Sequence, residues 1–184
     1  MQINVAQLLK AEVGAFKQHP VDGEIVIDGA VYAVKGELVL INTGRKILVQ
    51  GTLSAAAGFT CSRCLQPYTA QMPLKIEEEY YPVIDVNTGT KLEAPEDNGA
   101  FKIDERHTLD LSEAIRQYIV MALPMKPLCR EDCAGICPTC GKDLNLGKCD
   151  CPAEAVDPRW AELLKLKKNT RVTNMGKRGE KGRK

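Results

Sequence analysis

The chain has 184 residues, of which 44% are hydrophobic and 5% aromatic, and its formal net charge is +1. This length can bury a core without the help of a metal, and so few aromatic residues disfavour a nucleic-acid surface built on base stacking. The N-terminus lacks the basic and apolar regions of a signal peptide, and no stretch approaches the ~18 apolar residues of a membrane span. We therefore expect a cytoplasmic protein with reduced thiols and no membrane association.

The first part of the chain predicts a short helix followed by β-structure. Asn4 is placed to cap a helix whose apolar positions are Val5, Leu8, Leu9 and Val13, and His19-Pro20 interrupts that pattern. Glycine-bounded, β-branched runs then predict strands over residues 24–28, 31–35, 37–42 and 45–53, with one or two more over 68–83.

The connections between these strands are short, which favours antiparallel pairing. Asp28-Gly29 and Asn42-Thr43-Gly44 have the composition of hairpin turns. Residues 85–106 combine acidic side chains with glycine, proline and asparagine, and we expect a long, irregular, mobile loop there.

The clearest helical pattern begins at Asp110, with Glu113 as a capping-box variant, and stops before Pro124. Its apolar positions recur at helical spacing, which indicates a helix packed on the sheet; they are Leu111, Ile115, Tyr118, Ile119, Ala122 and Leu123. A further helix is predicted after Asp157-Pro158, carrying Trp160, Leu163 and Leu164.

The fold class predicted is therefore α+β: an antiparallel β-rich body with a packed amphipathic helix, then a cysteine-rich C-terminal module. We expect a body over residues 1–128, a metal module with its terminal helix over 129–168, and a disordered basic tail over 169–184. Residues 165–184 hold nine Lys/Arg and one acid, whereas residues 1–164 hold 16 bases and 23 acids. A net acidic body thus precedes a basic end.

Eight cysteines in a reducing compartment need an explanation other than disulfides, and metal is the first candidate. They fall into four pairs, which supply two tetrahedral four-thiolate sites with none left over: Cys61 and Cys64, Cys129 and Cys133, Cys137 and Cys140, and Cys149 and Cys151. Such spacing lets a tight turn present both sulfurs to one ion, with Zn–S near ~2.3 Å and sulfurs about 3.7 Å apart. Gly141 after Cys140 permits positive φ, which lets a backbone N–H approach a thiolate.

We predict that the two C-terminal pairs, Cys137/Cys140 and Cys149/Cys151, form one zinc site, because only eight residues separate them. Cys61, Cys64, Cys129 and Cys133 then form the other, which closes a long loop. The alternative grouping, Cys61 and Cys64 with Cys137 and Cys140, stays open at this point.

Several cations beside these pairs could offset the charge of a zinc–thiolate centre or contact phosphate, although a solvated charge is the simpler interpretation. They are Arg63, Arg130, Lys142 and Lys148, and the tail adds Arg171, Lys177 and Arg178 as candidate nucleic-acid contacts.

Catalysis finds little support in the sequence. Cys61–Cys64 lacks the strand–turn–helix setting of a thioredoxin-like pair, and four thiolates leave no open position for a catalytic zinc. His107 is not followed by the glutamate of zinc deaminases, and no phosphate-binding or dinucleotide-binding loop is present.

Taken together, these motifs resemble the YceD family of bacterial and plastid proteins, implicated in accumulation of large-subunit ribosomal RNA. The resemblance runs from about residue 20 to residue 168. It is carried by Cys61-Ser-Arg-Cys64-Leu-Gln-Pro, by Leu111–Leu123 leading to Leu-Pro-Met-Lys-Pro-Leu-Cys129, by Cys133-Ala-Gly-Ile-Cys137-Pro-Thr-Cys140-Gly-Lys-Asp-Leu-Asn145, by Cys149-Asp-Cys151 and by Asp157-Pro-Arg-Trp160.

The resemblance implies a non-enzymatic role in synthesis, processing or assembly of that RNA. The partners expected are ribosomal RNA or a pre-ribosomal particle, and a basic ribosomal protein is a further candidate; no small-molecule substrate is expected. A zinc storage or delivery protein and a thiol redox protein are the alternatives.

Overall fold

The computed structural model describes residues 1–93, 99–152 and 159. In chain order, these residues form β1 (Gln2–Asn4), α1 (Ala6–Lys10), β2 (Phe16–Ile27), β3 (Ala30–Asn42), β4 (Ile47–Thr60), β5 (Pro67–Pro82), β6 (Phe101–Ile103), β7 (Thr108–Asp110) and α2 (Ser112–Ala122). The β-rich α+β class predicted from the sequence is confirmed. The terminal helix predicted after Asp157-Pro158 and the basic tail lie outside the described residues, and the division at residue 128 stays a prediction.

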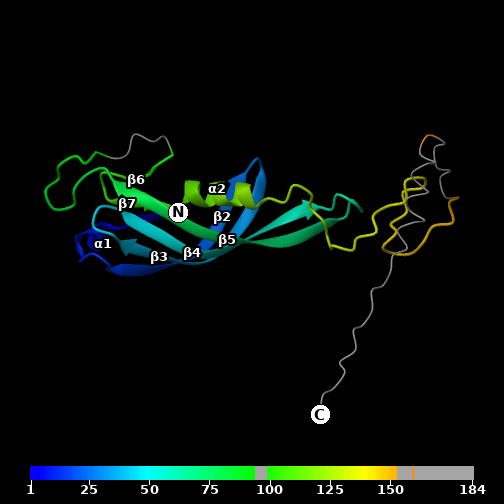
Figure 1. Cartoon of the computed structure of the whole chain (residues 1–184), viewed down its shortest axis with the longest axis horizontal. Helices are drawn as coiled ribbons and strands as arrows, with labels where there is room; N and C mark the ends of the chain where they lie inside the picture. The colour runs from blue at the N-terminus through cyan, green and yellow to red at the C-terminus, as the bar shows by residue number, and fades with distance from the viewer. Residues whose placement is uncertain (94–98, 153–158, 160–184) are drawn as a thin grey trace, which may run out of the picture.

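Within the described residues, the main sheet has the strand order β2-β3-β4-β5-β6, and β1 pairs separately with β7. Neighbours from β2 to β5 are antiparallel, as expected from short connections, whereas β6 joins β5 in parallel. Both predicted turns are present: Asp28 and Gly29 adopt positive φ (50° and 82°), and Gly44 does so at 93°. The sheet curls into a trough in which α2 lies (Figure 1).

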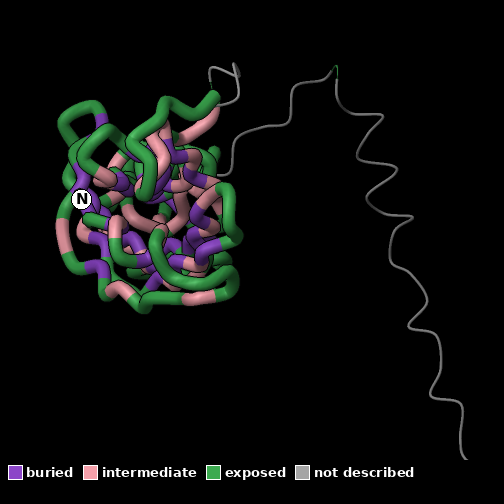
Figure 2. Tube along the Cα trace, turned by 90° about the vertical axis from the view of Figure 1, so that its left-hand side faces the viewer, coloured by how far each residue is buried: buried purple, intermediate pink, exposed green. Residues whose placement is uncertain are grey.

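The core fills the inside of this curl, as the burial of the chain shows in the end-on view (Figure 2). Alternate residues of β3, β4 and β5 point inward, including Leu38, Val49 and Ile76. Helix α2 closes the core by burying Ala114, Ile115 and Ile119. The body is therefore stabilised by packing of the helix on the sheet, in a core that contains no cysteine.

Two predicted strand boundaries are wrong. β3 runs through Gly36 without a break. Gly36 takes φ +152°, and an added Cβ would lie 2.6 Å from the Thr52 carbonyl oxygen, so the strand needs a glycine at this point. β2 begins at Phe16 and not at residue 24, so His19-Pro20, expected to interrupt the helical pattern, lies inside a strand. β2 is at the edge of the sheet, where a proline without an N–H group is tolerated.

The predicted helix ends also differ in detail. Asn4 does accept a hydrogen bond from the Ala6 N–H (3.1 Å), but α1 has only five residues and Val13 lies beyond it. Asp110 accepts from the Ser112 N–H (2.8 Å), whereas Glu113 pairs with Arg116 and makes no capping box. The region expected to be irregular contains β6, which the pairing of Phe101 with Tyr80 holds against β5.

The hairpin of β4 and β5 extends past the rest of the sheet. The pairing of β3 with β4 stops at Ala56, but β4 and β5 stay paired as far as Thr60 and Pro67. We call residues 57–70 the arm. Phe59 and Tyr68 face each other across it, with ring centroids 6.0 Å apart. The arm carries the turn of residues 61–66 away from the core, toward the cysteine-rich segment (Figure 1).

Candidate metal centre

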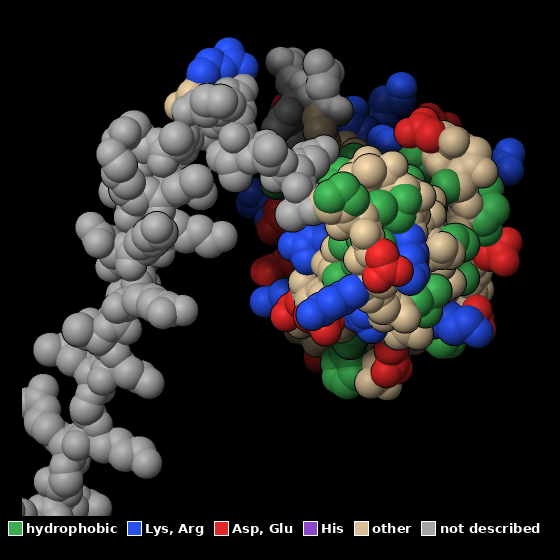
Figure 3. All heavy atoms as spheres, turned by 90° about the vertical axis from the view of Figure 1, so that its right-hand side faces the viewer, with side chains coloured by type: hydrophobic (Ala, Val, Ile, Leu, Met, Phe, Trp, Pro, Cys, Tyr) green, Lys and Arg blue, Asp and Glu red, His purple; other side chains and the backbone are tan. Residues whose placement is uncertain are grey.

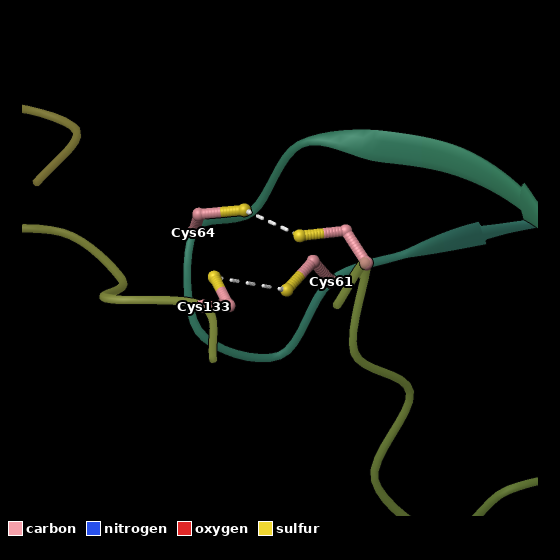
Figure 4. A group of neighbouring side chains, drawn as sticks. Cys61, Cys64 and Cys133 are labelled. Carbon is pink, nitrogen blue, oxygen red and sulfur yellow. Dashed lines mark hydrogen bonds between the residues drawn. The ribbon is translucent and has the colours of Figure 1, made fainter. Parts of the chain in front are cut away.

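Four thiols from two distant segments converge at the tip of the arm. Cys61 and Cys64 lie in the turn between β4 and β5, and Cys129 and Cys133 follow α2 in the chain. Figure 4 shows Cys61, Cys64 and Cys133 gathered at this turn. The Cys61 and Cys133 sulfurs are 3.8 Å apart, the Cys64 and Cys129 sulfurs are 3.7 Å apart, and all four lie within 4.8 Å of one another. A tetrahedral ion with Zn–S of ~2.3 Å needs sulfurs about 3.7 Å apart, so this quartet, which we call site 1, fits a zinc ion.

The second quartet is Cys137, Cys140, Cys149 and Cys151, whose sulfurs also lie within 4.8 Å of one another. We call it site 2. Among the described residues, the structure thus groups the thiols into the two sets predicted from the sequence, not into the alternative set. Site 1 takes two thiols from each side of the boundary predicted at residue 128.

The two CxxC turns have the same backbone hydrogen bonds. At site 1, the Cys61 N–H donates to the Gln66 carbonyl and the Leu65 N–H to the Cys61 carbonyl, both at 2.9 Å. At site 2, the Cys137 N–H donates to the Lys142 carbonyl (2.8 Å) and the Gly141 N–H to the Cys137 carbonyl (2.9 Å). The equivalent fifth residues, Leu65 and Gly141, both have positive φ, 60° and 72°. Gly141 was predicted to do so, whereas a leucine gives no such signal.

These turns aim backbone N–H groups at the first cysteine of each pair. The Cys64 N–H donates to the Cys61 thiol and, against the effect of burial, lowers its pKa to about 6. The Cys140 N–H does the same for Cys137, whose pKa is also lowered to about 6. Each quartet therefore contains a sulfur stabilised as the thiolate, the form that binds metal.

One other thiol in each quartet, Cys129 at site 1 and Cys151 at site 2, has a raised pKa. Desolvation and the neighbouring thiols raise the pKa of Cys129 to about 12. The Cys140 side chain and desolvation raise the pKa of Cys151 to about 12. Without an ion, each cluster keeps protons that a divalent metal would displace, so metal binding would release protons from both sites.

Arg63 joins the arm to the segment that carries the other two ligands of site 1. Its Nη1 donates to the carbonyl oxygens of Glu131 (3.1 Å) and Cys133 (2.9 Å). Beside it, the Ser62 N–H donates to the Pro127 carbonyl (2.8 Å). One of the cations predicted to contact nucleic acid thus has an intramolecular role.

Two more of the predicted cations of the module, Arg130 and Lys142, also have local partners. Arg130 donates to the Asn145 side chain (2.7 Å), and Lys142 donates to the Lys148 carbonyl (2.9 Å). The described side chains at this end of the molecule mix both signs of charge (Figure 3). Their nucleic-acid contacts stay a prediction, and Arg171, Lys177 and Arg178 lie outside the described residues.

Asn145 is absent from the ligands and cations predicted above, although it lies inside the C-terminal motif. Its Nδ2 donates to the Cys133 sulfur at 3.4 Å, so a residue between the ligand pairs of site 2 contacts a ligand of site 1. Cys133 itself has a lowered pKa: burial acts to raise it, but the Asn145 amide and the Gly135 N–H outweigh that effect. The available sequence signal was an asparagine within a four-cysteine loop, which alone does not specify a contact.

Comparison with known proteins gives one family match, to the model described as "Large ribosomal RNA subunit accumulation protein YceD", over residues 49–167. An uncharacterised protein of Mycobacterium tuberculosis is 35% identical over 121 residues, 65% of this chain and 55% of its own length. A second, from Mycobacterium leprae, is 30% identical over 131 residues, 71% of this chain and 57% of its own length. This chain thus spans little more than half the length of these relatives.

A shorter match links the chain to a plastid protein. The chloroplastic large ribosomal RNA subunit accumulation protein YCED homolog 1 of Arabidopsis thaliana is 34% identical over 59 residues, 32% of this chain and 18% of its own length. No solved structure matches the chain significantly. In the described residues, neither helix has the length and apolar character needed to cross a bilayer. Because the family model covers more than half of the chain and includes all eight cysteines, the chain belongs to the YceD family, for which no catalytic activity is known.

Proposed function

We propose that this chain is a non-enzymatic protein with two structural zinc ions that supports accumulation of large-subunit ribosomal RNA. The observation that carries the proposal is the family match over residues 49–167, which spans both thiol quartets. Family membership supports the role in ribosomal RNA accumulation, and the two thiol quartets support the binding of metal. A role in processing or assembly of that RNA is the specific form of the proposal.

Four thiolates suit zinc in a structural site, since soft sulfur ligands select zinc and a closed shell leaves no position for a substrate. Iron–sulfur clusters are held by thiolates as well, so the metal is to be identified by native mass spectrometry of the purified chain. At site 1 the ion would join Cys61 to Cys133, which lie 72 residues apart in the chain. Its binding energy would hold the arm against the segment after α2.

The distribution of charge along the chain supports a partner that contains both RNA and protein. The module's described face mixes charges (Figure 3), so it is a poor general surface for RNA. The C-terminal residues 165–184, with nine Lys/Arg, are the stronger candidates for phosphate contacts. The acidic body suits a basic ribosomal protein, and we propose a pre-ribosomal particle in the cytoplasm as the partner.

The alternatives fit the geometry less well. A thiol redox pair at Cys61 and Cys64 needs an accessible nucleophile, but both residues are buried, Cys61 with 0% of its surface exposed. A storage or delivery protein needs labile metal, whereas both quartets are braced by backbone hydrogen bonds. Slow release of zinc to a chelator would favour the structural function.

The decisive experiment measures both the level of ribosomal RNA in cells and the direct contacts between this chain and that RNA. In cells that lack this chain, we expect the ratio of large-subunit to small-subunit ribosomal RNA to fall, and the wild-type chain to restore it. A variant with Cys61→Ser and Cys64→Ser should fail to restore it, whereas deletion of residues 169–184 tests the tail separately. Crosslinking should recover large-subunit RNA or its particles; an unchanged RNA ratio together with no such crosslink would overturn the proposal.

A further inference from the structure

The segment between the two ligand pairs of site 2 reaches back to site 1. It runs from Gly141 to Lys148, and its residue Asp143 forms a β-bridge with Ile136. The Leu144 N–H donates to the Gly135 carbonyl at 2.8 Å. This segment therefore lies along residues 134–136, immediately after Cys133 of site 1.

Both ends of the Asn145 side-chain amide contact the site 1 segment. Nδ2 donates to the Cys133 sulfur (3.4 Å), while Oδ1 accepts from the Ala134 N–H (2.8 Å) and from Arg130 Nη2 (2.7 Å). Two donors at Oδ1 fix which end of the amide faces the sulfur. The residue thus presents an N–H group, not an oxygen, to a metal ligand.

Asn145 is itself held in place from within the segment. The Asp143 carboxylate accepts from the Asn145 backbone N–H (2.8 Å) and from its Nδ2 (2.7 Å). Because Cys140 and Cys149 bound the segment on both sides, an ion at site 2 would close it into a loop. Filling site 2 would therefore order the residue that stabilises a thiolate of site 1.

We propose that Asn145 is a positioning residue that couples the two metal sites, so that zinc at site 2 strengthens zinc binding at site 1. The inference rests on the zinc binding proposed above. An N–H group aimed at a ligand sulfur offsets the negative charge of a four-thiolate centre, and such outer partners typically change metal affinity about 10–100-fold. Since binding free energies are linked, zinc at site 1 strengthens site 2 by the same factor.

The two sites can be followed separately in the full-length chain. Zinc-loaded protein is exposed to stepped concentrations of a chelator, alkylated, digested and measured by peptide mass spectrometry, which gives the occupancy at each cysteine. Asn145→Asp keeps the oxygen that Ala134 and Arg130 contact but replaces the donor with a second oxygen. We expect it to weaken zinc binding at site 1 about 10-fold or more. The control, Leu146→Ala, alters a neighbour that is 85% exposed and should leave both sites unchanged.

A cycle with Cys140→Ser, which disables site 2, tests the coupling itself. We expect Cys140→Ser alone to weaken site 1 about 10-fold, and Asn145→Asp to add little in that background. Independent sites, shown by an unchanged site 1 in Cys140→Ser or by fully additive effects, would overturn the coupling while leaving zinc binding intact. Absence of zinc from both sites of the wild-type chain would instead contradict the proposed function.

Discussion

The guanidinium of Arg63, at the tip of the arm, donates to the carbonyl oxygen of Cys133 at 2.9 Å and thereby links the two halves of site 1. The same nitrogen also donates to the Glu131 carbonyl at 3.1 Å. A cation beside a CxxC turn can thus stabilise the turn instead of binding a nucleic acid. These two functions predict different effects of substituting Arg63.

We expect Arg63→Lys to accelerate zinc loss from site 1 nearly as much as Arg63→Ala does, by several-fold. Lysine keeps the charge, but its side chain is one bond shorter, so its ammonium does not reach the position from which Arg63 Nη1 donates to both carbonyls. The rate of zinc transfer to a chromogenic chelator measures this effect, with Lys126→Ala as a control for removal of an exposed cation nearby.

If Arg63 acts on phosphate instead, Arg63→Lys should keep most of the RNA affinity that Arg63→Ala loses, and neither should alter zinc release. That combination would contradict the intramolecular function of Arg63.

The equivalent turn residues Leu65 and Gly141 form a matched pair for backbone strain. Leu65 has φ +60° and is 61% exposed, so glycine there should relieve left-handed strain at little cost in burial. We expect Leu65→Gly to tighten zinc binding at site 1 by about 1 kcal/mol, roughly fivefold.

Gly141→Ala should have the opposite sign, weakening site 2 by a similar factor. An added Cβ at Gly141 would meet nothing within 4 Å, so strain alone is at stake. Chelator competition on both variants checks the pair; two changes of the same sign would show that φ at this position does not control affinity.

Ionisation of Tyr80 should reduce the stability of the body at alkaline pH, independently of the metal sites. Burial, with the Glu78 and Asp110 charges, raises its pKa above the usual value near ~10. A raised folded-state pKa contributes stability that is present below the unfolded pKa and is lost as pH rises. Above about pH 10, the free energy of unfolding should therefore fall by up to about 1.4 kcal/mol per pH unit from this group.

Tyr80→Phe removes this part of the pH dependence. At pH 7 the substitution should cost about 1 kcal/mol or less, because the hydrogen bond that the Tyr80 hydroxyl donates to the Asp110 carbonyl is long, at 3.3 Å. Denaturant unfolding from pH 7 to 11 measures both chains; parallel curves would show that Tyr80 does not cause this loss of stability.

Packing of α2 on the sheet is tested by Ile115→Ala. Ile115 is fully buried between the helix and the sheet, so the cavity should cost about 3 kcal/mol. Val120 lies on the same helix and is 45% exposed, so Val120→Ala should cost less than about 1 kcal/mol. Unfolding midpoints that fall equally for both variants would contradict the packing described.

The two cysteine quartets could be predicted because the geometry that a metal would need acts on local spacing: in a CxxC turn, both sulfurs can face one point. The grouping followed from loop length, since eight residues separate Cys140 from Cys149. The α2 core face was visible in the same way, as helical spacing of Ile115 and Ile119.

What could not be predicted depends on tertiary context. A proline inside β2 is acceptable only because β2 is an edge strand. Gly36 suggests a break in the sequence, but in the structure it is the residue that leaves room for the Thr52 carbonyl of β4. The contact of Asn145 with Cys133 arises from two segments packed together in space. The positive φ of Leu65 belongs to a tight turn, at a position where a leucine does not indicate that conformation. A single sequence holds no local signal for either.

Zinc content of the chain purified from cells without added metal tests the central claim most directly. Native mass spectrometry is expected to show two zinc ions per chain, with all eight cysteines protected from alkylation until a chelator is added. A chain that carries no zinc, or whose thiols react fully without a chelator, would contradict the account.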